Sequence, residues 1–196
     1  MNNFVILDNF IFDYKGDKNL LNELVIPEGI LGIFSSAFSR CPFLEKVSLP
    51  STMIYIGEEA FADCPLLKEV NFPPNLETIC NRAFSNCKSL ESIYLPDSII
   101  DIGNFCFSGC TSLKSINIPG RLKRLNTGLF EDCKSLKNIN IPYSISVIDR
   151  YVFLGCDNLD DIIIPITTVV NPLAFPFMYK YFHDVINKEE KELVHN

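Results

Sequence analysis

The chain of 196 residues is long enough for one domain or one stack of repeats, and 47% of its residues are hydrophobic, which suffices for a continuous core. Its 17 basic and 24 acidic residues give a formal charge of -7, which disfavours nucleic acid or an anionic membrane as the main partner, because phosphate binding needs clustered Lys and Arg. Membrane insertion is not predicted either, since the apolar stretch 162–177 is interrupted by Pro165, Pro172 and Pro176.

The first twenty residues (1–20) are predicted to form an N-terminal cap. Two apolar runs, 4–7 and 10–12, flank Asp8-Asn9, which predicts a hairpin-like arrangement. The first run is too short for the apolar core of a signal peptide, and neither Lys nor Arg precedes it. The sequence by itself therefore leads us to expect a cytoplasmic chain.

Residues 21–166 carry a repeat of 23 residues, with six full copies and half-copies at both ends. Phe recurs at one position of the repeat, Cys follows three residues later, and Leu follows three residues after the Cys. These positions are Phe38, Phe61, Phe84, Phe107, Phe130 and Phe153; Cys41, Cys64, Cys87, Cys110, Cys133 and Cys156; and Leu44, Leu67, Leu90, Leu113, Leu136 and Leu159. An apolar column precedes the Phe by five residues, at Ile33, Ile56, Ile79, Ile102, Leu125 and Ile148.

Each copy closes on a β-branched residue followed by an apolar-Pro pair, as at Val47 and Leu49-Pro50. This block predicts a short strand, because buried and outward positions alternate up to a proline that has no N–H and ends the strand. One such strand cannot bury its apolar side alone, but copies stacked in a parallel ladder can. We therefore predict a repeat solenoid whose stacked strands form a parallel β-sheet. Short strand, turn and 3-10 segments form its return part, and the phenylalanines form a row along the core.

The two ends depart from the repeat. The N-terminal half-copy has the strand positions, but Lys15 and Lys18 stand where Phe and Cys would be. At the other end the repeat fades after Pro165. Residues 167–196 are predicted to form a C-terminal cap, because residues 177–194 mix aromatic and charged side chains without Pro or Gly, as an amphipathic helix would.

The segment Ile56-Gly57-Glu58-Glu59-Ala60-Phe61-Ala62-Asp63-Cys64, which follows a Leu-x-x-Val-x-Leu-Pro type of block, resembles the BspA-like (Treponema pallidum type) leucine-rich repeats. The resemblance covers about residues 21–166. It implies a leucine-rich-repeat solenoid, a right-handed superhelix with a curved parallel β-sheet on its concave face, and a motif without catalytic residues. Members of this family occur on bacterial and protist surfaces, where some adhere to host or matrix proteins, so the resemblance implies a cell-surface location.

Six of the eight cysteines share one repeat position beside the Phe and Leu columns. Because a small buried Cys behaves as a compact hydrophobe, we predict a row of free thiols inside the coil. Disulfides between adjacent copies are the alternative, and they require matching dihedral geometry. Cys106 stands where Ala60 and Ala83 stand, and we expect it in the core. Cys80 replaces Gly57 at a turn, and we expect it to be the most exposed thiol. The cysteine spacing does not predict zinc, and we predict no metal or other cofactor.

Residues suited to catalysis are scarce. The two histidines, His183 and His195, lie outside the repeats, so a Ser-His-Asp or Cys-His site would have to borrow one of them. Adjacent carboxylates such as Glu58-Glu59 and Asp160-Asp161 would point to opposite faces of a strand and would not pair as acid and base. The usual phosphate-loop and zinc-protease motifs do not occur. We predict that the protein is not an enzyme.

Binding is expected on the outward side of the strand block, where two variable positions alternate with the buried ones. The candidate residues for contact with a protein ligand are Lys46, Ser48, Glu69, Asn71, Ser92, Tyr94, Ser115, Asn117, Asn138 and Asn140. Tyr94 is the best anchor, because aromatic residues near the centre of a patch often contribute much of the binding energy. Lys46 lies between Glu23 and Glu69, so these charges are also candidates for pairing across strands. A solvated sheet without a partner is the alternative.

A second candidate is the basic cluster of Arg121, Lys123 and Arg124, which is too small for nucleic acid but could meet an acidic partner or simply form a solvated turn. We predict a non-enzymatic protein-protein interaction module that binds a protein ligand through its concave sheet, with adhesion as the role that the family implies. The alternatives are an intracellular scaffold and a structural part of a longer repeat protein without a ligand of its own.

Overall fold

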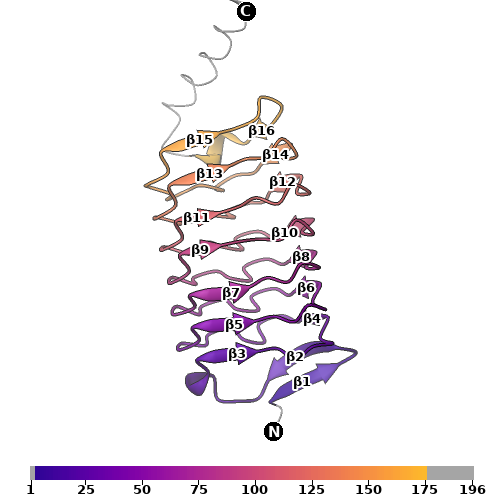
Figure 1. The fold of residues 1–196 in the computed structure, drawn as a ribbon. Helices are drawn as coiled ribbons and strands as arrows, with labels where there is room; N and C mark the ends of the chain where they lie inside the picture. Colours follow the sequence, from indigo (N-terminus) through magenta and orange to yellow (C-terminus); the bar gives the residue numbers. More distant parts are fainter. Residues whose placement is uncertain (1–2, 176–196) are drawn as a thin grey trace, which may run out of the picture.

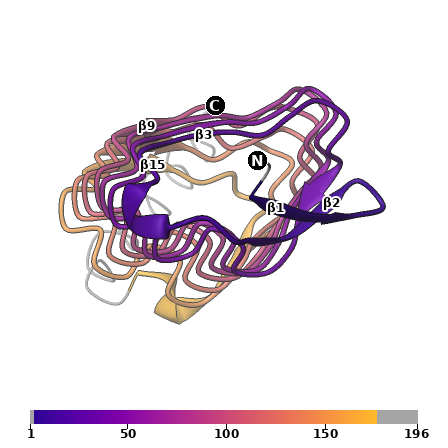
Figure 2. The same ribbon diagram turned by 90° about the horizontal axis from the view of Figure 1, so that it is seen from below.

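The computed structural model describes residues 3–175, which form a β-solenoid of stacked coils (Figure 1). Neighbouring coils are offset by 23 residues, since Glu23 lies opposite Lys46 and Lys46 lies opposite Glu69. Viewed along the stack, each coil closes around an interior that the side chains fill (Figure 2). The predicted repeat solenoid with parallel strands is confirmed.

The first row of strands is formed by the blocks that end in proline. It comprises β3 (Glu23–Val25), β5 (Lys46–Ser48), β7 (Glu69–Asn71), β9 (Ser92–Ile93), β11 (Ser115–Ile116), β13 (Asn138–Asn140) and β15 (Asp161–Ile163). All pairings in this row are parallel. The hydrogen bonds divide the row into three sheets, β3-β5-β7, β9-β11 and β13-β15, so the ladder is interrupted twice along the stack.

The Ile column forms a second row of strands on the return part of the coil. It comprises β2 (Phe10–Tyr14), β4 (Gly32–Ile33), β6 (Tyr55–Ile56), β8 (Thr78–Ile79), β10 (Asp101–Ile102), β12 (Arg124–Leu125), β14 (Val147–Ile148) and β16 (Val169–Val170). Within this row Ile33 lies opposite Ile56, and Ile56 lies opposite Ile79, so one buried isoleucine contacts the next. The row is divided between β10 and β12.

An antiparallel hairpin begins the stack. β1 (Phe4–Leu7) pairs with β2, and Asp8 and Asn9 between them have φ angles of 48° and 65°. β2 then pairs in parallel with β4, which places Ile11 opposite Ile33. The hairpin thus continues the second row. The first row begins at β3, after the 3-10 helix η1 (Lys18–Leu20).

Between the second and the first row, each coil makes a turn that we call the turn row. Two positions of this turn have positive φ in every full copy. They are Ser36, Glu59, Arg82, Phe105, Gly128 and Tyr151; and Arg40, Asp63, Asn86, Gly109, Asp132 and Gly155. Each turn donates main-chain hydrogen bonds to the next one, as from the Phe38 N–H to the Ala60 carbonyl at 2.9 Å. The turns are therefore joined coil to coil by main-chain bonds, as the strands are.

The phenylalanine column forms a continuous stack inside the coils. The ring centroids of successive members lie 5.3 to 6.1 Å apart, with interplanar angles of 9° to 21°. Phe4 and Tyr14 close the stack beside Phe38, and Phe175 closes it 4.7 Å from Phe153. Lys15, which stands at the Phe position of the N-terminal half-copy, has an exposed side chain, and Phe4 and Tyr14 supply the apolar surface that the first coil needs.

The described part of the chain ends after β16 with the 3-10 helix η2 (Pro172–Ala174) and Phe175. The helix predicted within 177–194 lies outside the described residues, and the cap boundaries remain predictions. Between residues 3 and 175 no helix has the length and apolarity needed to cross a membrane.

Candidate functional site

The ten candidate residues of the first strand row, which we call the strand face, include one prominent aromatic side chain. Tyr94 follows β9 directly and is 78% exposed. The alternation that buries Ile93 and Leu95 turns Tyr94 outward, as the sequence predicted. The structure therefore offers a large amphipathic ring on an otherwise polar surface.

Charged members of the strand face pair with each other. The Lys46 ammonium lies 3.1 Å from a Glu69 carboxylate oxygen, which confirms pairing across adjacent strands. One residue earlier in the coil, Lys68 pairs with Glu45 at 2.8 Å and Lys114 pairs with Glu91 at 2.7 Å. These ion pairs are largely exposed, so each contributes at most about 1 kcal/mol to stability. They also leave the middle of the face without net charge.

Two asparagines of the strand face have a structural task that the sequence did not reveal. The Asn117 side chain accepts a hydrogen bond from the Leu95 N–H at 2.7 Å and donates one to the Leu95 carbonyl at 2.8 Å. Asn71 makes the same pair of bonds to Leu49, at 2.8 and 3.4 Å. Their amide groups replace main-chain partners where the strand ladder stops. These two amide groups are therefore already engaged by the main chain.

Four of the five remaining polar members of the strand face are open to solvent, and the fifth, Ser48, is half-buried. Ser92, Ser115, Asn138 and Asn140 are exposed, and within residues 3–175 their side chains form no hydrogen bond. Ser92 lies opposite Ser115 in the β9-β11 pair, next to Tyr94. The structure thus brings an exposed aromatic ring together with unengaged hydroxyl and amide groups, a combination that antibody paratopes also use.

The second candidate, the basic cluster, is not a free cationic patch. Arg124 binds both carboxylate oxygens of Asp149, at 2.8 and 2.9 Å. Arg121 and Lys123 are exposed, without an ion pair inside the described part of the chain. Two unpaired charges on a turn are ordinary solvated surface. His183 and His195 lie outside the described residues.

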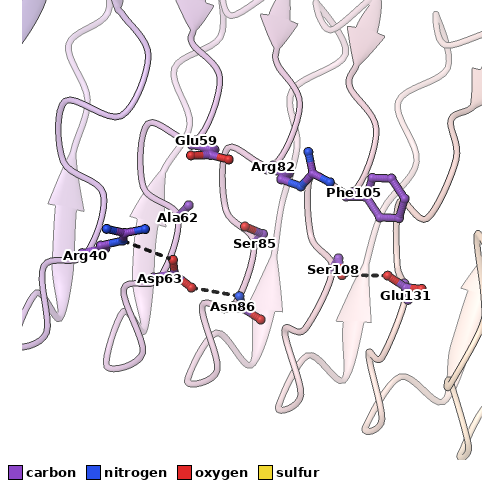
Figure 3. A pocket seen from close by; sticks show the side chains of 10 residues that line it. All are labelled: Arg40, Glu59, Ala62, Asp63, Arg82, Ser85, Asn86, Phe105, Ser108 and Glu131. Atoms are coloured by element: carbon purple, nitrogen blue, oxygen red, sulfur yellow. Dashed lines mark hydrogen bonds and ion pairs between the residues drawn. The ribbon is translucent and has the colours of Figure 1, made fainter.

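The turn row carries an open groove of about 280 Å³ that the sequence did not suggest (Figure 3). Its lining residues are Arg40, Glu59, Ala62, Asp63, Arg82, Ser85, Asn86, Phe105, Ser108 and Glu131. The Arg82 guanidinium lies over the Phe105 ring, 5.1 Å from its centroid. Asp63 accepts a hydrogen bond from Asn86 at 2.8 Å, and Glu131 accepts one from Ser108 at 3.3 Å. The groove is polar and mixed in charge.

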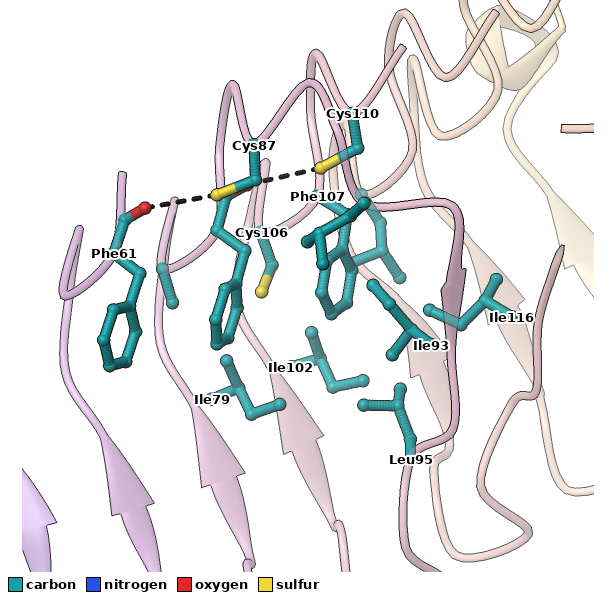
Figure 4. Close-up of a cluster of buried hydrophobic side chains, with 14 of the residues drawn as sticks. Phe61, Ile79, Cys87, Ile93, Leu95, Ile102, Cys106, Phe107, Cys110 and Ile116 are labelled. Carbon is teal, nitrogen blue, oxygen red and sulfur yellow. Dashed lines mark hydrogen bonds between the residues drawn. The ribbon is translucent and has the colours of Figure 1, made fainter. Parts of the chain in front are cut away.

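The cysteine column is buried and reduced in this structure, as predicted, and has a hydrogen-bonding role in addition (Figure 4). Each thiol from the second copy onward donates to the carbonyl of a phenylalanine one coil earlier. Cys87 donates to Phe61 at 3.2 Å, and Cys110 donates to Phe84 at 3.3 Å. Burial raises the pKa of Cys110 to about 12, so this thiol stays protonated at neutral pH. The column is structural.

The other two cysteines are placed as predicted. Cys106 is fully buried, and Cys80 is the least buried of the eight. The Cys80 thiol donates to the Tyr55 hydroxyl at 3.2 Å, and this hydrogen bond is the main reason why the pKa of Tyr55 rises to about 12. Across residues 3–175, no three acidic, His or Cys side chains are grouped in a way that could hold a metal ion.

The parallel strand rows, the stacked phenylalanines and the strand-ending prolines define a leucine-rich-repeat solenoid. The chain belongs to the BspA-type leucine-rich repeat family, whose model for the "BspA type Leucine rich repeat region (6 copies)" matches residues 2–94 and 77–178. This membership implies a protein-interaction or adhesion-type repeat module. Among curated proteins, none is significantly similar in sequence.

Solved structures of bacterial leucine-rich-repeat proteins have the same fold. A leucine-rich repeat protein from Bacteroides ovatus is 25% identical, with a TM-score of 0.63, over 86% of this chain and 53% of that protein. The Treponema pallidum leucine-rich repeat protein is 30% identical, with a TM-score of 0.57, over 78% of this chain and 83% of that one. A leucine-rich cell surface protein from Faecalibacterium prausnitzii is 26% identical, with a TM-score of 0.52, over 76% and 55%. The chain thus spans about half the length of two of these relatives.

Proposed function

We propose that this chain is a non-enzymatic module that binds a protein ligand through the strand face, with Tyr94 as the main anchor. The observation that carries the proposal is the 78% exposed tyrosine among unengaged Ser and Asn side chains. A tyrosine supplies a large contact area with few rotatable bonds, and the polar groups around it can each form a hydrogen bond to a partner. Adhesion-type binding is the kind of activity that the family implies.

A cell-surface role is the form of this proposal that we favour. One relative, from F. prausnitzii, is described as a cell surface protein. An intracellular scaffold with the same binding face is the second candidate. Labelling of intact cells with a reagent that cannot cross membranes distinguishes the two, because a surface protein is labelled without lysis and a scaffold is not.

The binding face is tested by affinity capture with matched tyrosine variants. Tyr143 is 88% exposed, lies in the segment after β13 and is not part of the strand face, so Tyr143→Ala is the control for Tyr94→Ala. We expect a specific partner to be retained by the wild-type chain and by Tyr143→Ala, and to be lost with Tyr94→Ala. Equal retention of that partner by all three proteins would remove the strand face from consideration.

A further inference from the structure

We propose that the groove in the turn row is a second, separate binding site, which takes an extended segment of a partner protein with an acidic and a basic side chain about three residues apart. This inference goes beyond the proposed function, because the groove shares no residue with the strand face. It rests on three observations: the shape of the groove, the unpaired Arg82 on its rim and the carboxylate of Glu131 at one of its ends.

The groove has a narrow floor between two raised rims. The floor is made of the small residues Ala62, Ser85 and Ser108, one from each of three successive coils. The rims are the two columns of positive-φ residues. Glu59, Arg82 and Phe105 form one rim, and Arg40, Asp63 and Asn86 form the other (Figure 3). The groove therefore runs along the stack, across coils, which suits a chain in extended conformation better than a compact ligand.

Arg82 is a positioned cation without a counter-ion. Its guanidinium is held over the Phe105 ring at 5.1 Å, and among the described residues it forms no ion pair. The absence of a side chain at Gly128 makes space for the Phe105 ring, because a Cβ atom at that position would lie 2.2 Å from ring atoms of Phe105. A stacked guanidinium keeps its N–H donors in one plane, which fits a carboxylate through two parallel hydrogen bonds. The ligand chemistry at this point is therefore an acidic side chain.

Glu131 provides an opposite charge at the end of the groove that is nearer the C-terminus, while Arg82 belongs to the middle of the coils that line it. It is half-buried, and its carboxylate accepts one hydrogen bond from the Ser108 hydroxyl at 3.3 Å, with no cation paired to it within residues 3–175. Arg82 and Glu131 belong to coils that are two steps apart in the stack, so their main chains are separated by roughly 10 Å at the usual spacing between parallel strands, and the Arg82 guanidinium lies over Phe105 in the coil between them. An extended polyproline-type segment rises about 3.1 Å per residue, so two side chains three residues apart span this distance.

The test is titration of the purified chain with fluorescein-labelled hexapeptides of the sequence Gly-Glu-Pro-Pro-Lys-Gly, followed by fluorescence anisotropy. We expect saturable binding that weakens about tenfold when the peptide Glu is replaced by Gln and about tenfold with Arg82→Gln, because a charge-assisted contact is lost in each case. Arg121→Gln is the matched control, since Arg121 is exposed and outside the groove, and it should bind as the wild type does. Ser85→Tyr fills the floor and should abolish binding.

Charge reversal makes the test specific to this contact. Arg82→Glu should lose the Glu-containing peptide and gain binding to Gly-Lys-Pro-Pro-Lys-Gly, which the wild-type chain should bind poorly. Tyr94→Ala should leave both titrations unchanged, so that failure of the groove and failure of the strand face are distinguishable. The proposal is overturned if no peptide binds at millimolar concentration, or if Arg82→Gln and Ser85→Tyr bind as the wild type does while their melting curves show that both are folded.

Discussion

The inside of the coil repeats strictly, whereas its outward surface varies from copy to copy. Six phenylalanines stack in one column, and the cysteines beside them donate to carbonyls in the same way from copy to copy. On the strand face, one column instead runs through Ser48, Asn71, Tyr94 and Asn117. An interior side chain contacts its own equivalent in the next coil and must match it, while an outward side chain is free of this constraint. Departures from the repeat on the surface, such as Tyr94 and the Arg82-Phe105 pair, are therefore where binding is to be sought.

The largest expected effect comes from opening a gap in the interior. Phe84→Ala removes a fully buried ring between Phe61 and Phe107 and should lower the free energy of unfolding by roughly 3–5 kcal/mol. Tyr94→Ala, on the surface, should change it by no more than about 0.5 kcal/mol. Urea unfolding followed by circular dichroism measures both. Similar losses for the two variants would mean that the distinction between interior and surface is wrong.

Alkaline pH should weaken the interior of the coil. Burial raises the pKa of Cys110 and Cys156 from near 9 to about 12. Below pH 9 these thiols are protonated in both states, so their contribution to stability is fully present. Above pH 9 the unfolded chain loses protons that the folded chain keeps, so stability falls as the pH rises toward 12. Urea midpoints at pH 7.5 and pH 10 should show this decrease.

A matched variant separates the thiol contribution from other effects of alkali. Cys110→Ala removes one of the titrating groups, so its midpoint should fall less between pH 7.5 and pH 10 than that of the wild type. An equal decrease in both proteins would contradict the assignment of this pH dependence to the cysteine column.

A smaller loss of stability is expected for one asparagine of the strand face and almost none for another. Asn117→Ala removes two hydrogen bonds to the Leu95 main chain and should cost about 1 to 2 kcal/mol. Asn140 is exposed, and Asn140→Ala should be nearly neutral. Thermal melts of the two variants test this. If Asn140→Ala proved the more destabilising of the two, the structural role of Asn117 would be refuted.

Most of the fold could be predicted from the sequence, because the same residue types recur at the same positions in six copies and each copy makes the same contacts. The Phe column, the Cys column and the first strand row all follow from spacing alone. The ends could not be predicted this way: Phe175 lies 22 and not 23 residues after Phe153, and Tyr14 takes the place that spacing gives to Lys15. The position of such cap residues is determined by packing against a single neighbouring coil and not by the repeat, since they contact a coil on one side only.

The candidate site was predicted in part. The outward position of Tyr94 and the Lys46-Glu69 pair followed from strand alternation. The backbone-bonding role of Asn117 could not, because Asn140 occupies the same repeat position without that bond. The groove does not follow from the sequence, because its positive-φ rims are built from Arg, Asp, Asn, Glu and Phe and lack the glycine signature of such turns. A small residue between two such positions in successive copies is the signal that could have revealed it.

Thiol accessibility tests the central claim, a stack of coils with its repeat residues inside, most directly. The native protein should be treated briefly with a maleimide at pH 7.5 and each cysteine quantified by mass spectrometry, with a second sample labelled in denaturant. We predict rapid native labelling at Cys80 alone and labelling of all eight cysteines in denaturant. Rapid native labelling of Cys64, Cys87 or Cys110 would contradict the account, because these thiols would then face solvent and not the neighbouring coil.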